Sequence, residues 1–172
     1  MKEITEAVTV KSVSVNREIL FIIMAFVIPF TLSSPQWLTG TIVNALLIVA
    51  SYRMSFKKLI PVIVLPSLGT FAHGAVFGPL TIFLAYFIPF IWISNFLLIK
   101  TFSIKQVRRW SYPYRLILAA FVKTIFLFTV AVVMVQLKLV PPVFLSAMGI
   151  LQLATALSGG LAAYLILKSK LI

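Results

Sequence analysis

The chain has 172 residues, of which 62% are hydrophobic and 10% charged, and its mean hydropathy is +1.13. Soluble domains are typically about 45–50% apolar and about 25% charged, so this composition excludes an ordinary soluble globular protein. The 15 Lys and Arg residues outnumber 3 acids, which gives a net charge of +12. The basic residues lie in short clusters between long apolar runs, a pattern typical of membrane proteins, and we expect no nucleic-acid partner.

The apolar runs predict an all-α integral membrane protein, a compact bundle of six transmembrane helices in one domain covering residues 1–172. A spanning helix needs about 20 apolar residues, so six spans leave no room for a separate extramembrane domain. Residues 1–17 are polar and are predicted to form a cytoplasmic N-terminal tail. The six predicted spans, which make up a bundle over 19–167, are 19–32, 38–51, 59–72, 80–99, 116–137 and 143–167.

Positive charge gathers on one side of this predicted topology. With the N-terminus inside, Lys138 falls in an outer loop and Lys123 within the fifth span, which leaves 13 of the 15 basic residues on the inner side. The positive-inside rule therefore predicts that both termini are cytoplasmic and that the protein is a multi-pass component of the cell membrane. The basic inner face is expected to attract anionic lipid headgroups.

Acidic side chains are missing from every predicted span, because Glu3, Glu6 and Glu18 all precede residue 19. Proton-coupled transport and acid–base hydrolysis therefore lack their usual carboxylates. The single histidine and the absence of cysteine leave too few ligands for a metal cluster, and no GxxxxGK[ST] phosphate-binding motif is present. We expect no enzymatic activity, no cofactor and no metal site.

Uncharged polar residues are predicted to gather near the outer surface. With a rise of 1.5 Å per residue, Asn44 in the second span lies about 10 Å below the outer edge and Gln152 in the sixth about 14 Å below it, while His73 ends the third span on the same side. Such a set can furnish a largely apolar pocket with its few polar groups. The residues predicted to bind substrate there are Gln36, Trp37, Asn44, His73, Gln152 and Thr155.

A structural interpretation stays open for several of these groups. A neutral Asn or Gln within a span often bridges two helices, and for Asn44 and Gln152 both interpretations hold. For Asn95, in the inner half of the fourth span, the structural one is preferred. Lys123 is expected to extend toward the inner interface, because an unpaired charge at mid-membrane costs about 2.5–3.5 kcal/mol.

The sixth span carries small residues at spacings of four, among them Gly159 and Gly160. Such spacings let another helix backbone approach closely. We assign Asn95, Lys123, Gly159 and Gly160 structural or coupling roles. The three tryptophans, Trp37, Trp92 and Trp110, are expected to anchor the bundle at the membrane interfaces.

Four sequence patterns follow one another in the order seen in a known family. They are TGTIVNALL at 39–47, PFIWISN at 89–95, Lys123 in the fifth span and QLATALSGG at 152–160. With six short spans and both ends inside, the chain resembles the substrate-binding S components of energy-coupling factor (ECF) transporters. The resemblance covers the second to the sixth span.

The resemblance implies a subunit that captures a vitamin or another micronutrient with high affinity. It also implies two kinds of partner, a transmembrane coupling subunit and a pair of cytoplasmic ATPases. Two alternatives remain open, a scaffold or assembly protein whose polar groups only join helices, and a small membrane-embedded enzyme. A pocket containing Asn44, His73 or Gln152 would favour capture, whereas a solid core would favour the scaffold.

Overall fold

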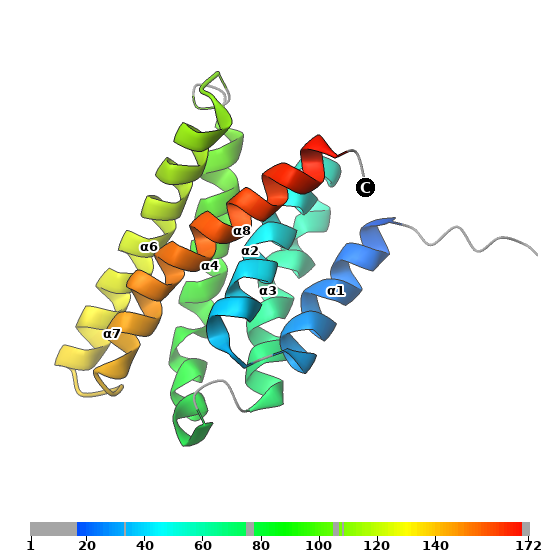
Figure 1. The fold of residues 1–172 in the computed structure, drawn as a ribbon. Helices are drawn as coiled ribbons and strands as arrows, with labels where there is room; N and C mark the ends of the chain where they lie inside the picture. The colour runs from blue at the N-terminus through cyan, green and yellow to red at the C-terminus, as the bar shows by residue number, and fades with distance from the viewer. Residues whose placement is uncertain (1–16, 33, 75–77, 105–106, 108, 170–172) are drawn as a thin grey trace, which may run out of the picture.

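The computed structural model describes residues 17–32, 34–74, 78–104, 107 and 109–169. The predicted tail, residues 1–17, lies outside these residues except for Arg17. Every regular element in the described chain is helical, as predicted (Figure 1). The elements are α1 (Arg17–Thr31), α2 (Gln36–Arg53), α3 (Phe56–His73), η1 (Gly78–Phe83), α4 (Leu84–Ser103), α6 (Tyr112–Gln136), α7 (Val143–Met148) and α8 (Ile150–Lys168).

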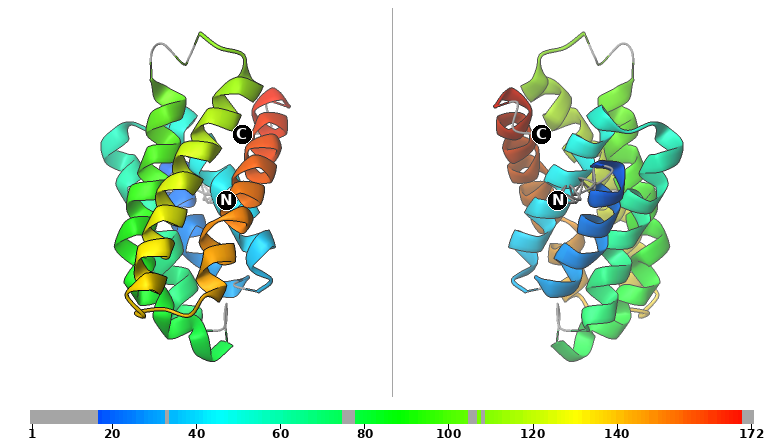
Figure 2. Two further views of the ribbon diagram at one scale, coloured as in Figure 1. Left: turned by 90° about the vertical axis from the view of Figure 1, so that its left-hand side faces the viewer. Right: turned by 90° about the vertical axis from the view of Figure 1, so that its right-hand side faces the viewer.

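The long helices run alternately up and down in a single bundle (Figures 1 and 2). The main pairings are α2 with α8, α1 with α3 and α4 with α6. Local sequence sets the helix ends: α3 stops where Gly74 adopts a left-handed conformation, with φ of 77°. The first turn of α6 contains a proline, at a position where the missing N–H costs nothing because it would have no partner within the helix.

Three helical stretches are long and apolar enough to cross a membrane: Gly78–Ser103, Tyr112–Gln136 and Val143–Lys168. Glu18–Thr31 is a shorter apolar helix. The outward face of α6 is a stripe of large apolar side chains, Ile117, Phe121 and Ile125, whereas Lys123 on the same helix is buried. This inverts the usual pattern of a water-soluble protein, and together with the three long apolar stretches it is compatible with a helical membrane protein.

The predicted sixth span, 143–167, is broken at Gly149 into α7 and α8. The backbone of Gly149 has φ of −100° and ψ of −104°. A Cβ atom at this position would lie 2.6 Å from the carbonyl oxygen of Leu145 and 2.9 Å from Cδ2 of Phe128. The break therefore depends on a residue without a side chain, and it turns α8 across α2.

Two glycines allow helices to touch through their backbones. A Cβ atom at Gly159 of α8 would lie 2.5 Å from the carbonyl oxygen of Thr41 in α2, and one at Gly69 of α3 would lie 2.5 Å from that of Phe26 in α1. Where α2 and α8 cross, the hydroxyl groups of Thr41 and Ser158 are also 2.8 Å apart. Close backbone approach of this kind is typical of helix packing in membranes.

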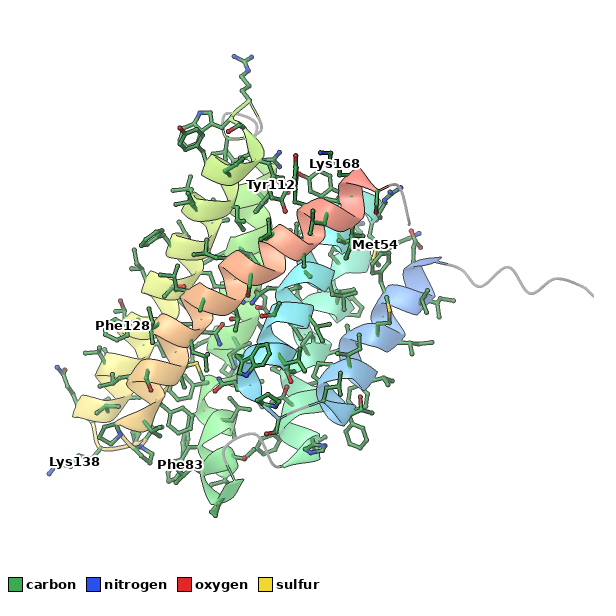
Figure 3. All side chains as sticks on the ribbon, in the orientation of Figure 1. Met54, Phe83, Tyr112, Phe128, Lys138 and Lys168 are labelled. Atoms are coloured by element: carbon green, nitrogen blue, oxygen red, sulfur yellow. The ribbon has the colours of Figure 1, made fainter. Side chains whose placement is uncertain are left out.

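Charged side chains gather at one end of the bundle, which we call the basic end. It holds the last turns of α2, α4 and α8 and the first turns of α3 and α6, and Figure 3 shows Met54, Tyr112 and Lys168 there. Lys58 of α3 pairs with Glu18 of α1 at 2.6 Å. Phe83 and Lys138 lie at the opposite end (Figure 3). The basic residues at the basic end whose side chains the structure describes are Arg53, Lys57, Lys58, Lys100, Arg109, Arg115 and Lys168.

Candidate functional site

A polar layer lies between two apolar cores. The core nearer the basic end includes Leu98 of α4 and Leu116 of α6. The core nearer the opposite end includes Phe87 of α4 and Leu127 of α6. Between these positions lie Asn95 on α4 and Lys123 on α6, and Asn44 of α2 joins them through hydrogen bonds centred on Lys123.

Lys123 is the centre of this layer. Its side chain is only 3% exposed, and Nζ donates hydrogen bonds to Oδ1 of Asn44 at 2.7 Å and to Oδ1 of Asn95 at 2.9 Å. The expected extension of Lys123 toward the inner interface is therefore wrong. The two amide oxygens replace water around the ammonium group, so the side chain stays at mid-bundle.

Each asparagine is oriented by its own amide nitrogen. Nδ2 of Asn44 donates to the carbonyl oxygen of Gly40 at 2.8 Å and lies 3.4 Å from Oγ1 of Thr155 on α8. Nδ2 of Asn95 donates to the carbonyl oxygen of Ile63 on α3 at 3.1 Å. Because both nitrogens are engaged in this way, both side-chain oxygens turn toward Lys123.

The sequence-based depths of these residues need correction. Asn44 was expected in the outer half and Asn95 and Lys123 in the inner half, yet hydrogen bonds join all three. Depth was counted from the end of each span, and those ends are staggered. Figure 1 shows η1 and the start of α4 reaching farther at the opposite end than the start of α2.

A cavity of about 90 Å³ adjoins the lysine. It lies on the side of the polar layer that faces the opposite end, because its lining on α2, α3 and α4, apart from Asn95 of the polar layer itself, comes from the halves of these helices nearest that end. Its wall has a polar part and an apolar part that includes Val43, Leu84, Ile91 and Met148. The polar lining residues are Gln36, Thr39, Asn44, Ser67, Thr70, Asn95, Lys123 and Gln152.

The predicted substrate-binding residues divide into two groups. Gln36, Asn44 and Gln152 line the cavity, and buried Thr155 lies directly behind Asn44. Trp37 is 57% exposed on the first turn of α2. His73 is exposed at the end of α3, where its ring meets the edge of Phe30 at 6.1 Å between centroids. Neither Trp37 nor His73 is among the lining residues.

Trp92 differs from its expected role as an interfacial anchor. It lies in the middle of α4, and its indole nitrogen donates to Oγ of Ser67 at 2.8 Å and to the carbonyl oxygen of Val64 at 3.2 Å. Side chains of α4 thus bond to two consecutive carbonyl oxygens of α3, that of Val64 from Trp92 and that of Ile63 from Asn95. A signal for this role was present, because Trp92 precedes Asn95 by three residues and shares its helix face.

Sequence reasoning also missed Ser67 and Thr70 as lining residues of the cavity. Their spacing of three places both on one face of α3, which was the available signal.

Comparison with known proteins adds no assignment: no family model, no curated protein and no solved structure matches this chain. The fold and the site describe an all-helical bundle, compatible with a membrane protein, that buries a lysine beside a partly polar cavity.

Proposed function

We propose that this chain is the substrate-capture subunit of an ECF-type importer and holds a micronutrient in the cavity beside Lys123. One observation carries the proposal: a buried cationic side chain, fixed by Asn44 and Asn95, adjoins a cavity that is also lined by the side-chain amides of Gln36 and Gln152. Polar and ionisable residues inside a membrane bundle are costly and are typically functional. A protein that only holds helices together gains little from a cavity at this position.

The distribution of charge supports an orientation for capture. Basic residues near membrane spans favour the cytoplasmic side, so the basic end would face the cell interior and the cavity would open toward the outside. In this proposal α1, α2, α3, α4, α6 and α8 each cross the membrane, and both termini are cytoplasmic. Substrate would then enter from the side on which an importer meets it.

The proposal assigns the energy-consuming step to partner proteins. The sequence has no GxxxxGK[ST] motif with which to bind ATP phosphates. Binding alone does not drive uphill transport, so a transmembrane coupling subunit and a pair of ATPases would supply the cycle. This division of labour agrees with the family resemblance of the four sequence patterns.

Native mass spectrometry of the purified protein tests capture directly. We expect a small molecule to co-purify with the wild type and to be lost from Gln152→Leu, whose far-UV circular dichroism stays unchanged. Gln136→Leu is the matched control, because Gln136 is exposed at the end of α6 and lies outside the cavity. A wild-type protein free of any bound molecule would favour the scaffold instead.

A further inference from the structure

We infer that the ligand of this cavity is a small monocarboxylate whose negative charge pairs with Lys123. The inference rests on the proposed capture function and specifies the chemical class of the captured substrate.

The first support for a carboxylate ligand is the unbalanced positive charge of Lys123. In the part of the chain that the structure describes, Glu18 is the only acidic side chain, and it lies at the basic end beside Lys58. Buried charges are normally paired, so the missing partner is expected to arrive with the ligand.

The second support is the geometry of the ammonium group. A lysine has three N–H donors, and two of them are directed to Asn44 and Asn95. Lys123 is also one of the residues that line the cavity. An oxygen atom in the cavity can therefore complete the coordination of Nζ, and a charged oxygen forms the stronger bond.

The third support is the chemistry of the remaining wall. Gln36 and Gln152 line the cavity, and neither side-chain amide has a hydrogen bond within the described chain. Their N–H groups can bind the second oxygen of a carboxylate. Lys123 is the one cation among the lining residues described, which matches a single negative charge rather than two.

Size and polarity then limit the rest of the ligand. The cavity measures about 90 Å³, below the roughly 150 Å³ that holds benzene in an engineered protein and the roughly 300–1,000 Å³ of sites for drug-sized ligands. The side chains of Leu84, Ile91 and Met148 belong to its apolar part. A short aliphatic chain fits this part while the carboxylate reaches Lys123.

Isothermal calorimetry of the purified full-length protein in detergent tests the charge. The probes are acetate, propionate and butyrate, each compared with its uncharged amide, together with inorganic phosphate. We expect at least one carboxylate to bind roughly 10- to 100-fold more tightly than its amide, the ratio given by a hydrogen bond to a charged group. Equal affinities, the absence of carboxylate binding, or tighter binding of phosphate would overturn the inference.

Two lysine variants locate the effect. Lys123→Met is expected to lose the preference for carboxylate over amide, whereas Lys138→Met, at the opposite end of the bundle, should keep it. Gel filtration and circular dichroism establish that each variant is folded. The comparison of carboxylate with amide in the wild type needs no variant, so it decides the matter even if Lys123→Met does not fold.

Failure of this inference is distinguishable from failure of the proposed function. An uncharged molecule found by native mass spectrometry, lost in Gln152→Leu, would reject the carboxylate and leave capture intact. A wild-type protein that carries no molecule and binds none of the probes would reject both. A co-purified monocarboxylate that disappears in Lys123→Met would support both.

Discussion

The side-chain oxygen of Asn95 lies 2.9 Å from Nζ of Lys123 and accepts a hydrogen bond from it. The nitrogen of the same amide donates to the carbonyl oxygen of Ile63. One side chain therefore joins α3, α4 and α6, and it is 1% exposed. This residue links the stability of the bundle to the position of the lysine.

Replacing Asn95 by leucine should destabilise the protein by about 3 kcal/mol, because the change removes two buried hydrogen bonds and leaves the ammonium group with one partner. Unfolding in detergent, followed by circular dichroism, measures the loss. Ser94→Ala is the control: Ser94 is equally buried, but its hydroxyl bonds only to Ile91 within α4. Equal losses in the two variants would mean that the Asn95 network contributes nothing specific.

An internal carboxylate should compete with the ligand. Asn44→Asp places a negative charge where Oδ1 of Asn44 now lies, 2.7 Å from Nζ of Lys123. We expect the affinity for the best-binding carboxylate probe to fall at least tenfold, as for the loss of a charge-assisted bond, measured by calorimetry. Gln136→Glu makes the same change of charge outside the cavity and should bind like the wild type. Unchanged affinity in Asn44→Asp would contradict pairing between Lys123 and the ligand.

Much of the helical fold follows from sequence pattern. Long apolar runs separated by polar turns predicted the helices, and residues such as Asn44 and Gln152 stood out as polar groups inside them. Their contacts could not be predicted from the same pattern. Which helices meet depends on steric detail, such as the break at Gly149 and the missing side chain at Gly159.

The misjudged lysine illustrates the same limit. The cost of an isolated charge in a membrane is a general property, and it favoured extension of Lys123 to the interface. Whether the charge stays buried depends on partners from other helices. Asn44 and Asn95 are separated from Lys123 by 79 and 28 residues, so only the assembled bundle brings their oxygens to the lysine.

The close crossing of α2 and α8 should be sensitive to a single methyl group. In Gly159→Ala the added methyl group would meet the backbone of α2. We expect this contact to destabilise the protein by about 1–3 kcal/mol, although alanine is the better helix former. Gly160→Ala is the comparison, since its methyl group would meet side-chain atoms of Leu116, which can move. Detergent unfolding measures both, and a larger loss for Gly160→Ala would contradict the backbone contact.

Single-cysteine variants test the membrane topology, because the natural chain has no cysteine of its own. Lys57, His73 and Lys138 are all exposed. An impermeant maleimide added to intact cells should modify Lys138→Cys and His73→Cys, whereas Lys57→Cys should react only after permeabilisation. Lys57 and His73 lie at the two ends of α3, so opposite reactivity would mean that this helix crosses the membrane, although it is not one of the three stretches that are long and apolar enough to do so by composition. Labelling of Lys57→Cys from outside would instead turn the cavity toward the cytoplasm, and capture from the exterior would be impossible.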